Sequence, residues 1–329
     1  MNSLPLGEVA CADAVTFLQS LPDSCLDACI TDPPYAEVNR PYGRLTEAEW
    51  WSLIVEGVVP EVRRCLKPTG SAVFIIQPNS RKVGSMRGWV FEFMAWVCRE
   101  WNMVQDAWWW NYVALPAAGA TSAGLLRPSV KPCVWCGPED CYRDQDSVLA
   151  ILSGRTVERA SIGYYQTNPR SAPPSGSGVS DGKAYGRAME RGGSTPFNCL
   201  AIHNGMGKGD ESAGAHGHGA GTPLPLMRWW TRYIVPPGGV VCDPFMGSGT
   251  GALAAIAEGR QFIGCERDAL YVQTARYRIA KALREHQDRL PLDEQDAAAI
   301  VGQWPGDETD EEIAEALSVL EGDAAGSDP

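Results

Sequence analysis

Two short motifs carry residue types that could do chemistry, and the first is Asp32-Pro33-Pro34-Tyr35. The Asp32 carboxylate and the Pro33 carbonyl, held side by side, would offer two acceptors to one exocyclic NH₂ group. The two prolines would fix the direction of that carbonyl, and the Tyr35 ring would let a planar base stack. These groups could hold the amino group of an adenine or cytosine taken out of its helix. The simpler alternative is a proline turn that closes a strand.

The second motif is Asp243-Pro244-Phe245-Met246-Gly247-Ser248-Gly249-Thr250, whose glycines let the backbone approach a ligand at the start of a helix. Glu266 lies 19 residues after Gly247, where a carboxylate can accept hydrogen bonds from both ribose hydroxyls of an adenosine group. The spacing Gly247-x-Gly249-x-x-Ala252 also satisfies a loose dinucleotide fingerprint. Asp243 would repel a pyrophosphate but can pair with the amino group of an amino-acid-bearing cofactor. That favours S-adenosylmethionine over NAD.

Together the two motifs resemble those of the DNA amino-methyltransferases, which make N6-methyladenine or N4-methylcytosine. The catalytic tetrad comes first and the cofactor loop last, which is similar to the permuted β-class of bacterial and phage enzymes. The resemblance covers about residues 4–137 and 222–283. It implies a catalytic role for Asp32, Pro33, Pro34 and Tyr35. It also implies that S-adenosyl-L-methionine is bound by Asp243, Pro244, Phe245, Gly247, Ser248, Gly249, Thr250 and Glu266.

Two further segments compare with the family's pattern. Asp13 matches an acidic residue after the first strand that contacts the adenine side of the cofactor, although Ala12 stands where Gly is usual. Thr222-Pro223-Leu224-Pro225 stands where the family often has a Lys-Pro pair. Because Leu224 replaces the Lys, a polar contact to the methionine end of the cofactor is either missing or supplied elsewhere.

The elements that must position these motifs alternate between strand and helix, which predicts a doubly wound, mostly parallel α/β sheet of the Rossmann-like methyltransferase type. Thr46 and Glu49 form a capping-box signature at the start of a predicted helix, 46–67. The other predicted helices are 88–100, 226–235, 249–258 and 269–285, the last capped by Asp268. The predicted strands include 26–30, 71–76, 107–113, 240–243 and 261–266.

Composition and charge divide the chain further. We expect a catalytic half at 1–137, an irregular inserted target-recognition region at 138–221, a cofactor-binding half at 222–284 and an acidic tail at 285–329. The whole chain carries a net charge of −12, but the tail alone carries −13, so the rest carries +1. Residues 151–208 carry +4, which suits either a solvated insertion or a basic element that closes on a polyanion.

The eleven cysteines give a weaker signal. Cys133, Cys136 and Cys141 could act as three thiolate ligands for zinc, with His203 as a fourth. Cys133 and Cys136 also fall in an apolar run that predicts a strand, so packed thiols without metal are the preferred interpretation. We therefore expect no metal in the site.

The sequence thus predicts S-adenosylmethionine-dependent methylation of an exocyclic amino group of a base in double-stranded DNA, with the base flipped out. Within the resembling family Asp32 favours adenine N6. Cytosine N4, a methylated RNA or protein amide, and a non-catalytic DNA-binding relative are the alternatives. A homodimer and a cognate restriction nuclease are partners that the resemblance leaves open. With neither a long apolar run nor a signal-like N-terminus, we expect no membrane contact and a cytoplasmic location.

Overall fold

A computed structural model describes residues 4–39, 43–111, 123–126, 128–150, 190–202 and 222–287. The chain forms two compact units, and the first comprises Met1–Tyr142 and Cys199–Pro329. Its strands are β1 (Val9–Cys11), β2 (Leu26–Thr31), β3 (Leu66–Ile75), β4 (Ser80–Lys82), β5 (Ser85–Met86), β6 (Met103–Gln105), β7 (Trp108–Trp110), β8 (Val130–Cys136), β9 (Cys199–Ala201), β10 (Val240–Asp243) and β11 (Gln261–Glu266). Its helices are α1 (Ala14–Ser20), α2 (Glu47–Trp51), η1 (Ser52–Val58), α3 (Val59–Cys65), α4 (Trp89–Glu100), α9 (Leu224–Ile234), α10 (Thr250–Ala257) and α11 (Ala269–Gln287).

Nine of these strands form one sheet, in the order β1-β11-β10-β2-β3-β8-β7-β9, with β6 paired to β8. The first five strands in that order run parallel to one another. β8 then pairs antiparallel with β3, and β7 antiparallel with β8. The predicted mostly parallel α/β fold is therefore confirmed, with an antiparallel part at one end. β10 lies beside β2 although the two strands come from opposite ends of the sequence, and this pairing brings the two halves of the chain together.

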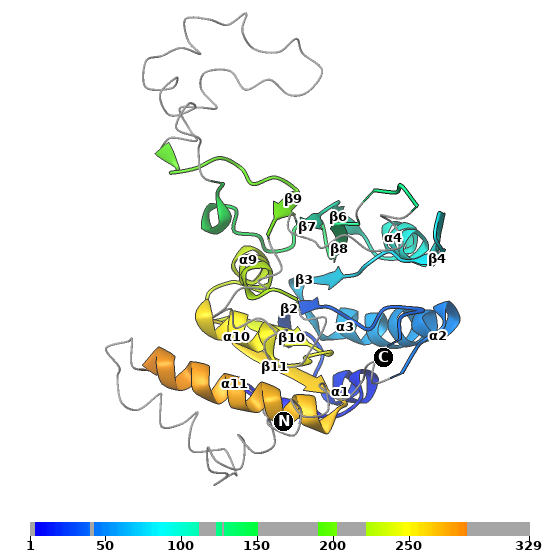
Figure 1. Cartoon of the computed structure of the whole chain (residues 1–329). Helices are drawn as coiled ribbons and strands as arrows, with labels where there is room; N and C mark the ends of the chain where they lie inside the picture. The colour runs from blue at the N-terminus through cyan, green and yellow to red at the C-terminus, as the bar shows by residue number, and fades with distance from the viewer. Residues whose placement is uncertain are drawn as a thin grey trace, which may run out of the picture. The chain divides into compact units, whose positions relative to one another are not determined.

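Helices cover both faces of the sheet, as a doubly wound fold requires (Figure 1). On one face α1, the helical run from α2 to α3, and α4 pack against alternate strand residues such as Cys29 and Phe74. On the other face α9, α10 and α11 pack against the intervening residues, such as Ile30 and Val73. Both faces of β2 and β3 are buried, which explains why their sequences read as continuous apolar runs rather than alternating ones.

The helical run from Glu47 to Cys65 confirms the helix predicted for 46–67. Thr46 and Glu49 form the complete capping box: the Thr46 side chain accepts from the Glu49 N–H, and the Glu49 carboxylate accepts from the Thr46 N–H. The middle of the run, η1, is a π-helix rather than an α-helix. It ends at Val58, two residues before Pro60, whose ring clashes with the preceding turn in a regular α-helix, and the wider π-turn relieves such crowding.

The remaining predicted elements of this unit are confirmed with small shifts at their ends. β10 and β11 have the predicted bounds, and α11 begins after Asp268, which accepts a hydrogen bond from the Leu270 N–H at 2.9 Å. β3 begins at Leu66, five residues before the predicted strand. Within the described residues no helix is long and apolar enough to cross a membrane.

The second unit, Arg143–Asn198, is described only at 143–150 and 190–198. It holds a short 3₁₀ helix, η2 (Asp146–Val148), a bridge between Ala150 and Ser194, and an ion pair between Arg191 and Asp146. Most of the predicted recognition region, 151–189 and 203–221, lies outside the described residues, as does the tail beyond residue 287.

Candidate active site

The two sequence motifs meet at a cavity of about 240 Å³ in the first unit. β1, β2, β10 and β11 run parallel and end at Cys11, Thr31, Asp243 and Glu266, so the residues that follow them gather at one edge of the sheet. Of the predicted site residues, the cavity is lined by Asp13, Asp32, Pro33, Pro34, Tyr35, Asp243, Pro244, Phe245, Gly247, Ser248, Thr250 and Glu266. The structure thus brings twelve of the thirteen predicted residues together.

The thirteenth predicted residue, Gly249, does not line the cavity but forms part of the turn between β10 and α10. It has φ +89°, in the left-handed region that glycine adopts without strain, and it forms the N-cap of α10. A side-chain Cβ at this position would lie 3.1 Å from Ala275 of α11. Gly247 has φ +53° for the same kind of turn. Both glycines are therefore required by the backbone path, as predicted from their spacing.

Asp243 is a buried carboxyl at the end of β10, with 7% of its surface exposed. Its Oδ1 accepts two hydrogen bonds, from the Thr31 hydroxyl at 2.7 Å and from the Phe245 N–H at 3.0 Å. Burial raises its pKa from 3.8 to about 7, although these two hydrogen bonds oppose the rise, and the nearby carboxylates of Asp32 and Glu266 add to it. A cation bound next to Asp243 in the cavity would therefore stabilise its ionised form.

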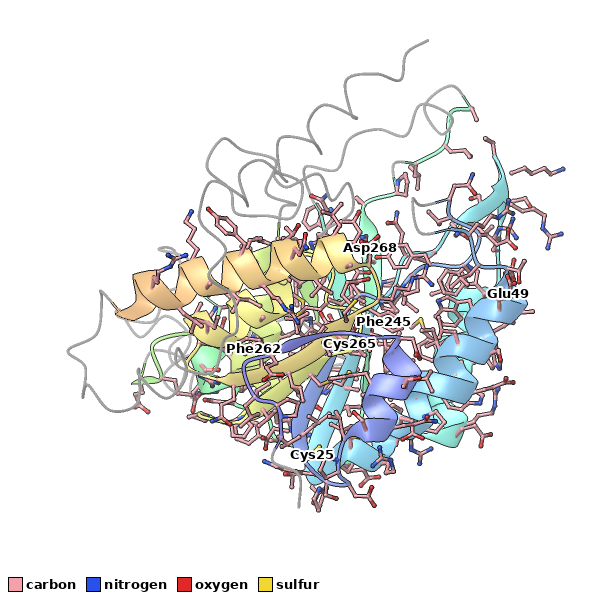
Figure 2. All side chains as sticks on the ribbon, turned by 90° about the horizontal axis from the view of Figure 1, so that it is seen from below. Cys25, Glu49, Phe245, Phe262, Cys265 and Asp268 are labelled. Atoms are coloured by element: carbon pink, nitrogen blue, oxygen red, sulfur yellow. The ribbon has the colours of Figure 1, made fainter. Side chains whose placement is uncertain are left out.

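Glu266 closes the cofactor loop from the neighbouring strand. Its Oε2 accepts from the Gly247 N–H at 3.0 Å, and its Oε1 accepts from the Asp268 N–H at 2.9 Å. A carboxylate has about four acceptor sites, so Glu266 can still accept hydrogen bonds from a ligand. Figure 2 shows Asp268 at the start of α11, with Phe245 and Cys265 near the same edge. The Met246 N–H donates to the Cys265 carbonyl at 2.9 Å, which fixes the loop against β11.

Asp13 lines the cavity as the N-cap of α1, two residues after Cys11, which pairs with Glu266 across β1 and β11. The Asp13 carboxylate accepts from the Thr16 N–H at 2.9 Å. Hydrogen bonding to Thr16 lowers the pKa of Asp13, so this group stays ionised at neutral pH. Three carboxyl groups with different partners, Asp13, Asp243 and Glu266, therefore line the same cavity.

Three residues that contact the tetrad directly were not predicted from the sequence: Thr222, Trp50 and Lys131. The hydroxyl of Thr222 donates to Oδ2 of Asp32. Thr222 is buried, lines the cavity and belongs to the segment in which Leu224 replaces the family's usual Lys. No local signal could have identified this contact, because 190 residues separate the two partners in sequence. Thr222 supplies a polar contact to the tetrad.

Backbone carbonyls of the tetrad loop are held by side chains from the face of the sheet that α4 covers. The indole N–H of Trp50 donates to the Pro34 carbonyl at 2.7 Å. The Asn79 amide donates to the Ala36 carbonyl at 2.6 Å, and the Trp89 indole N–H donates in turn to the Asn79 amide oxygen at 3.1 Å. Trp50 and Trp89 are fully buried and pack together, with ring centroids 4.6 Å apart. These bonds fix the loop on both sides of Tyr35.

Tyr35 itself has a cationic neighbour on β8. The Lys131 ammonium donates to the Tyr35 hydroxyl at 3.2 Å and lies 5.3 Å from the centre of its ring. The same ammonium lies 4.8 Å from the Trp109 ring centre. The two rings and the cation stabilise one another, which orients Tyr35. Of the three tryptophans in β7, Trp109 is buried and Trp110 is exposed, as the alternation of side chains along a strand requires.

The candidate zinc ligands behave as packed thiols. Cys133 and Cys136 lie buried in β8, and burial raises the pKa of the Cys133 thiol to about 12 and that of Cys136 well above its usual value. Within the described ranges no cluster of three or more His, Cys, Asp or Glu residues could hold a metal ion. His203, the proposed fourth ligand, lies outside the described residues.

Known proteins with related sequences are DNA methyltransferases. The chain is 28% identical over 288 residues to the type II methyltransferase M.PvuII of Proteus hauseri, covering 83% of each chain. It is 24% identical over 270 residues to the DNA adenine methyltransferase YhdJ of Escherichia coli strain K12, covering 81% of this chain and 80% of that one.

Solved structures share the fold. The cytosine-N4-specific PvuII DNA methyltransferase matches with a TM-score of 0.63 at 20% identity, over 95% of this chain and 91% of that one. A putative DNA modification methylase of Thermus thermophilus matches with a TM-score of 0.51 at 19% identity, over 84% of this chain and 94% of that one. The sequence profile of the N6/N4 methyltransferase family, described as DNA methylase, matches residues 26–277. Because this match covers well over half of the chain, the protein belongs to the N6/N4 DNA methylase family.

Proposed function

We propose that the protein transfers a methyl group from S-adenosyl-L-methionine to the exocyclic amino group of a base in double-stranded DNA, with the base flipped into the cavity. The observation that carries this proposal is the meeting of Asp32 and the Pro33 backbone with Asp243 and Glu266 around one cavity. The first pair suits an amino group, and the second suits a cofactor with an amino acid at one end and a ribose at the other.

The residues present fit S-adenosyl-L-methionine. Asp243 is a buried acid whose pKa is raised to about 7 by burial, and the ammonium group of the cofactor's methionine part can supply the compensating charge. Glu266 retains acceptor sites for ribose hydroxyls. We assign Asp13, by the resemblance, to the adenine side. The Gly247 to Thr250 turn allows the backbone to approach the ligand closely.

The tetrad can perform its part of the reaction by hydrogen bonding alone. When bound, the cofactor supplies an electrophilic methyl group on a sulfonium ion. Asp32 and the Pro33 carbonyl accept the two N–H bonds of the target amino group and draw its lone pair out of conjugation with the ring. The same two acceptors stabilise the positive charge that develops on that nitrogen as the carbon–sulfur bond of the sulfonium breaks. The nitrogen then releases one proton to solvent, leaving a neutral methylamino group and a neutral thioether. Tyr35, oriented by Lys131, stacks on the base.

For the target base we propose adenine N6, because Asp32 supplies a charged acceptor at the first position of the tetrad. A second candidate is cytosine N4, and a specific observation favours it: the PvuII enzyme, which matches here in both sequence and fold, is named as cytosine-N4-specific. YhdJ, a relative of similar coverage, is named as an adenine methyltransferase. Both bases present an exocyclic amine that the same acceptors can hold.

Mass spectrometry of nucleosides, after reaction of duplex DNA with labelled S-adenosyl-L-methionine, tests the proposal. We expect label in N6-methyladenine and none with Asp32→Ala. Label in N4-methylcytosine alone would overturn the choice of base but not the activity, whereas label in no DNA nucleoside would overturn the DNA substrate. We further propose that the region 138–221 supplies target recognition and that the enzyme acts in the cytoplasm. A homodimer and a partner nuclease are expectations from the resemblance.

A further inference from the structure

The β4–β5 hairpin is an exposed, basic element outside the region expected to recognise DNA. Ser80, Arg81 and Lys82 of β4 are all exposed, and β5 pairs with β4 antiparallel. Two apolar side chains beside them are also exposed, Val83 at 57% and Met86 at 58%. Cations next to exposed apolar groups suit a nucleic-acid partner, because the cations can contact backbone phosphates and the apolar groups can contact the sugars.

The hairpin lies at the edge of the sheet that holds the tetrad. It follows the carboxyl end of β3, which pairs in parallel with β2, and the tetrad follows the carboxyl end of β2. Its base is joined to the tetrad loop by the Asn79 amide, which donates to the carbonyl of Ala36, the residue directly after Tyr35. The Arg87 N–H donates to the Asn79 carbonyl at 3.0 Å and closes the hairpin.

A second connection ties the hairpin to the same loop. The Arg87 guanidinium lies 3.5 Å from the Glu37 carboxylate and donates to Glu47 at 2.6 Å. The positive charge of Arg87 is thus used within the protein. Arg81 and Lys82 differ, because within the described part of the chain neither forms an ion pair. Their charges remain available to a ligand.

We propose that the β4–β5 hairpin binds the sugar-phosphate backbone of double-stranded DNA next to the flipped base, with Arg81 and Lys82 contacting phosphates. This inference rests on the proposed function for its ligand. Exposed cations are common on protein surfaces, but Arg81 and Lys82 lie on a hairpin whose base is hydrogen-bonded to Ala36. Ala36 directly follows Tyr35, the residue on whose ring we propose that the base stacks. A backbone contact there would place the target base in register with the tetrad, whatever sequence the rest of the protein reads.

The test compares two double variants that remove the same charge. Arg81→Ala/Lys82→Ala removes the hairpin cations. Arg99→Ala/Arg284→Ala removes two cations from the last turn of α4 and the end of α11. Both helices start at the tetrad edge and run away from it, so the control cations lie at the opposite edge of the sheet. The affinity for a duplex oligonucleotide is measured by fluorescence anisotropy at several salt concentrations, and S-adenosyl-L-methionine binding by calorimetry.

We expect the hairpin variant to bind duplex DNA about tenfold more weakly at low salt and the slope of log affinity against log salt to fall by about two. Cofactor affinity and melting temperature should not change. The control variant should bind DNA within about twofold of the original protein, by the same salt dependence.

Equal DNA affinity in the two variants would overturn the inference while leaving the proposed function intact. If the unaltered protein binds no duplex DNA and methylates none, both are overturned. Weaker binding with an unchanged salt slope would also contradict the assignment, because it would mean that the cations do not act on phosphates.

Discussion

Thr222 holds the carboxylate of Asp32 by a hydrogen bond from its hydroxyl to Oδ2, across 190 residues of sequence. The protein thus uses one of the roughly four acceptor sites of this carboxylate and restrains its rotation, and the remaining sites stay available to a target amino group. The segment that contains Thr222 enters α9 directly, so the packing of α9 on the sheet determines where this hydroxyl lies.

We predict that Thr222 acts as a positioning residue. Thr222→Val keeps the shape of the side chain but removes the donor, so the Asp32 carboxylate can turn away from the amino group. We expect kcat to fall about 10- to 100-fold, the range for a misplaced catalytic group, with the cofactor Kd unchanged. Thr222→Ser should restore most of kcat because it keeps the hydroxyl. A Val variant with full kcat would show that the bond is only structural.

The two acids of the motifs should fail in different ways. Asp32→Ala should abolish methyl transfer and leave cofactor binding intact, because the proposed role of Asp32 is to contact the base and not the cofactor. Asp243→Ala should weaken cofactor binding itself, because it removes the buried partner of a cation. Calorimetric titration with S-adenosyl-L-methionine, run beside single-turnover methylation, separates the two effects. Near-normal turnover by Asp32→Ala would refute the assignment of the tetrad.

The raised pKa of Asp243 predicts that cofactor binding depends on pH. A bound ammonium group requires the ionised carboxylate, so the proton must leave Asp243, whose pKa is about 7. We expect the cofactor affinity to fall about tenfold per pH unit below pH 7, because the ionised fraction falls by that factor. Asp243→Asn should bind weakly and without this dependence between about pH 6 and 7.5. A pH-independent Kd in the original protein would rule out the role of Asp243 as a titrating partner.

The same carboxyl group should cost stability in the absence of cofactor. Its folded pKa lies above its ordinary value of 3.8, so the folded protein binds the proton more tightly than the unfolded chain. The contribution of Asp243 to the free energy of unfolding is therefore most favourable below about pH 4 and is lost as the pH rises towards 7. We expect Asp243→Asn to melt at a higher temperature than the original protein at about pH 8, with a smaller difference at about pH 4.5. A larger difference at the acid end would contradict this sign.

We also predict that Trp50 acts on the tetrad through one hydrogen bond. Trp50→Phe keeps an aromatic ring in the core but leaves the Pro34 carbonyl without its donor, which costs about 1–3 kcal/mol when the group is buried. Both the free energy of unfolding and kcat should fall. Trp51→Phe is the matched control, because it removes an indole from the next position. Among the residues that the structure describes, the Trp51 ring makes an edge contact with Trp96 and its indole N–H forms no hydrogen bond. Equal kcat in the two variants would dismiss the role of Trp50.

Much of the fold could be predicted from local sequence. The capping box at Thr46 and the Asp268 cap of α11 act over a few residues, so their signals are contiguous. The strand ends could be predicted for the same reason, because Pro33 and Pro34 stop β2 and the glycine turn stops β10. The predicted start of β3 was too late because Pro68-Thr69-Gly70 signals a turn, yet β2 pairs with the stretch from Leu66 through a register shift.

The types of the site residues were also determined by the sequence alone. Asp32 followed by two prolines predicts a pair of hydrogen-bond acceptors, and Asp243 followed by spaced glycines predicts a ligand-binding turn. Both can be read from the sequence, because each motif consists of consecutive residues that fix their own backbone conformation. What only the tertiary structure decided is how those motifs are completed. The pairing of β10 with β2 places Asp243 against Thr31, and the packing of α9 places Thr222 against Asp32. These contacts join residues 212 and 190 positions apart, and no local pattern encodes them, because they follow from how whole strands and helices pack around one core.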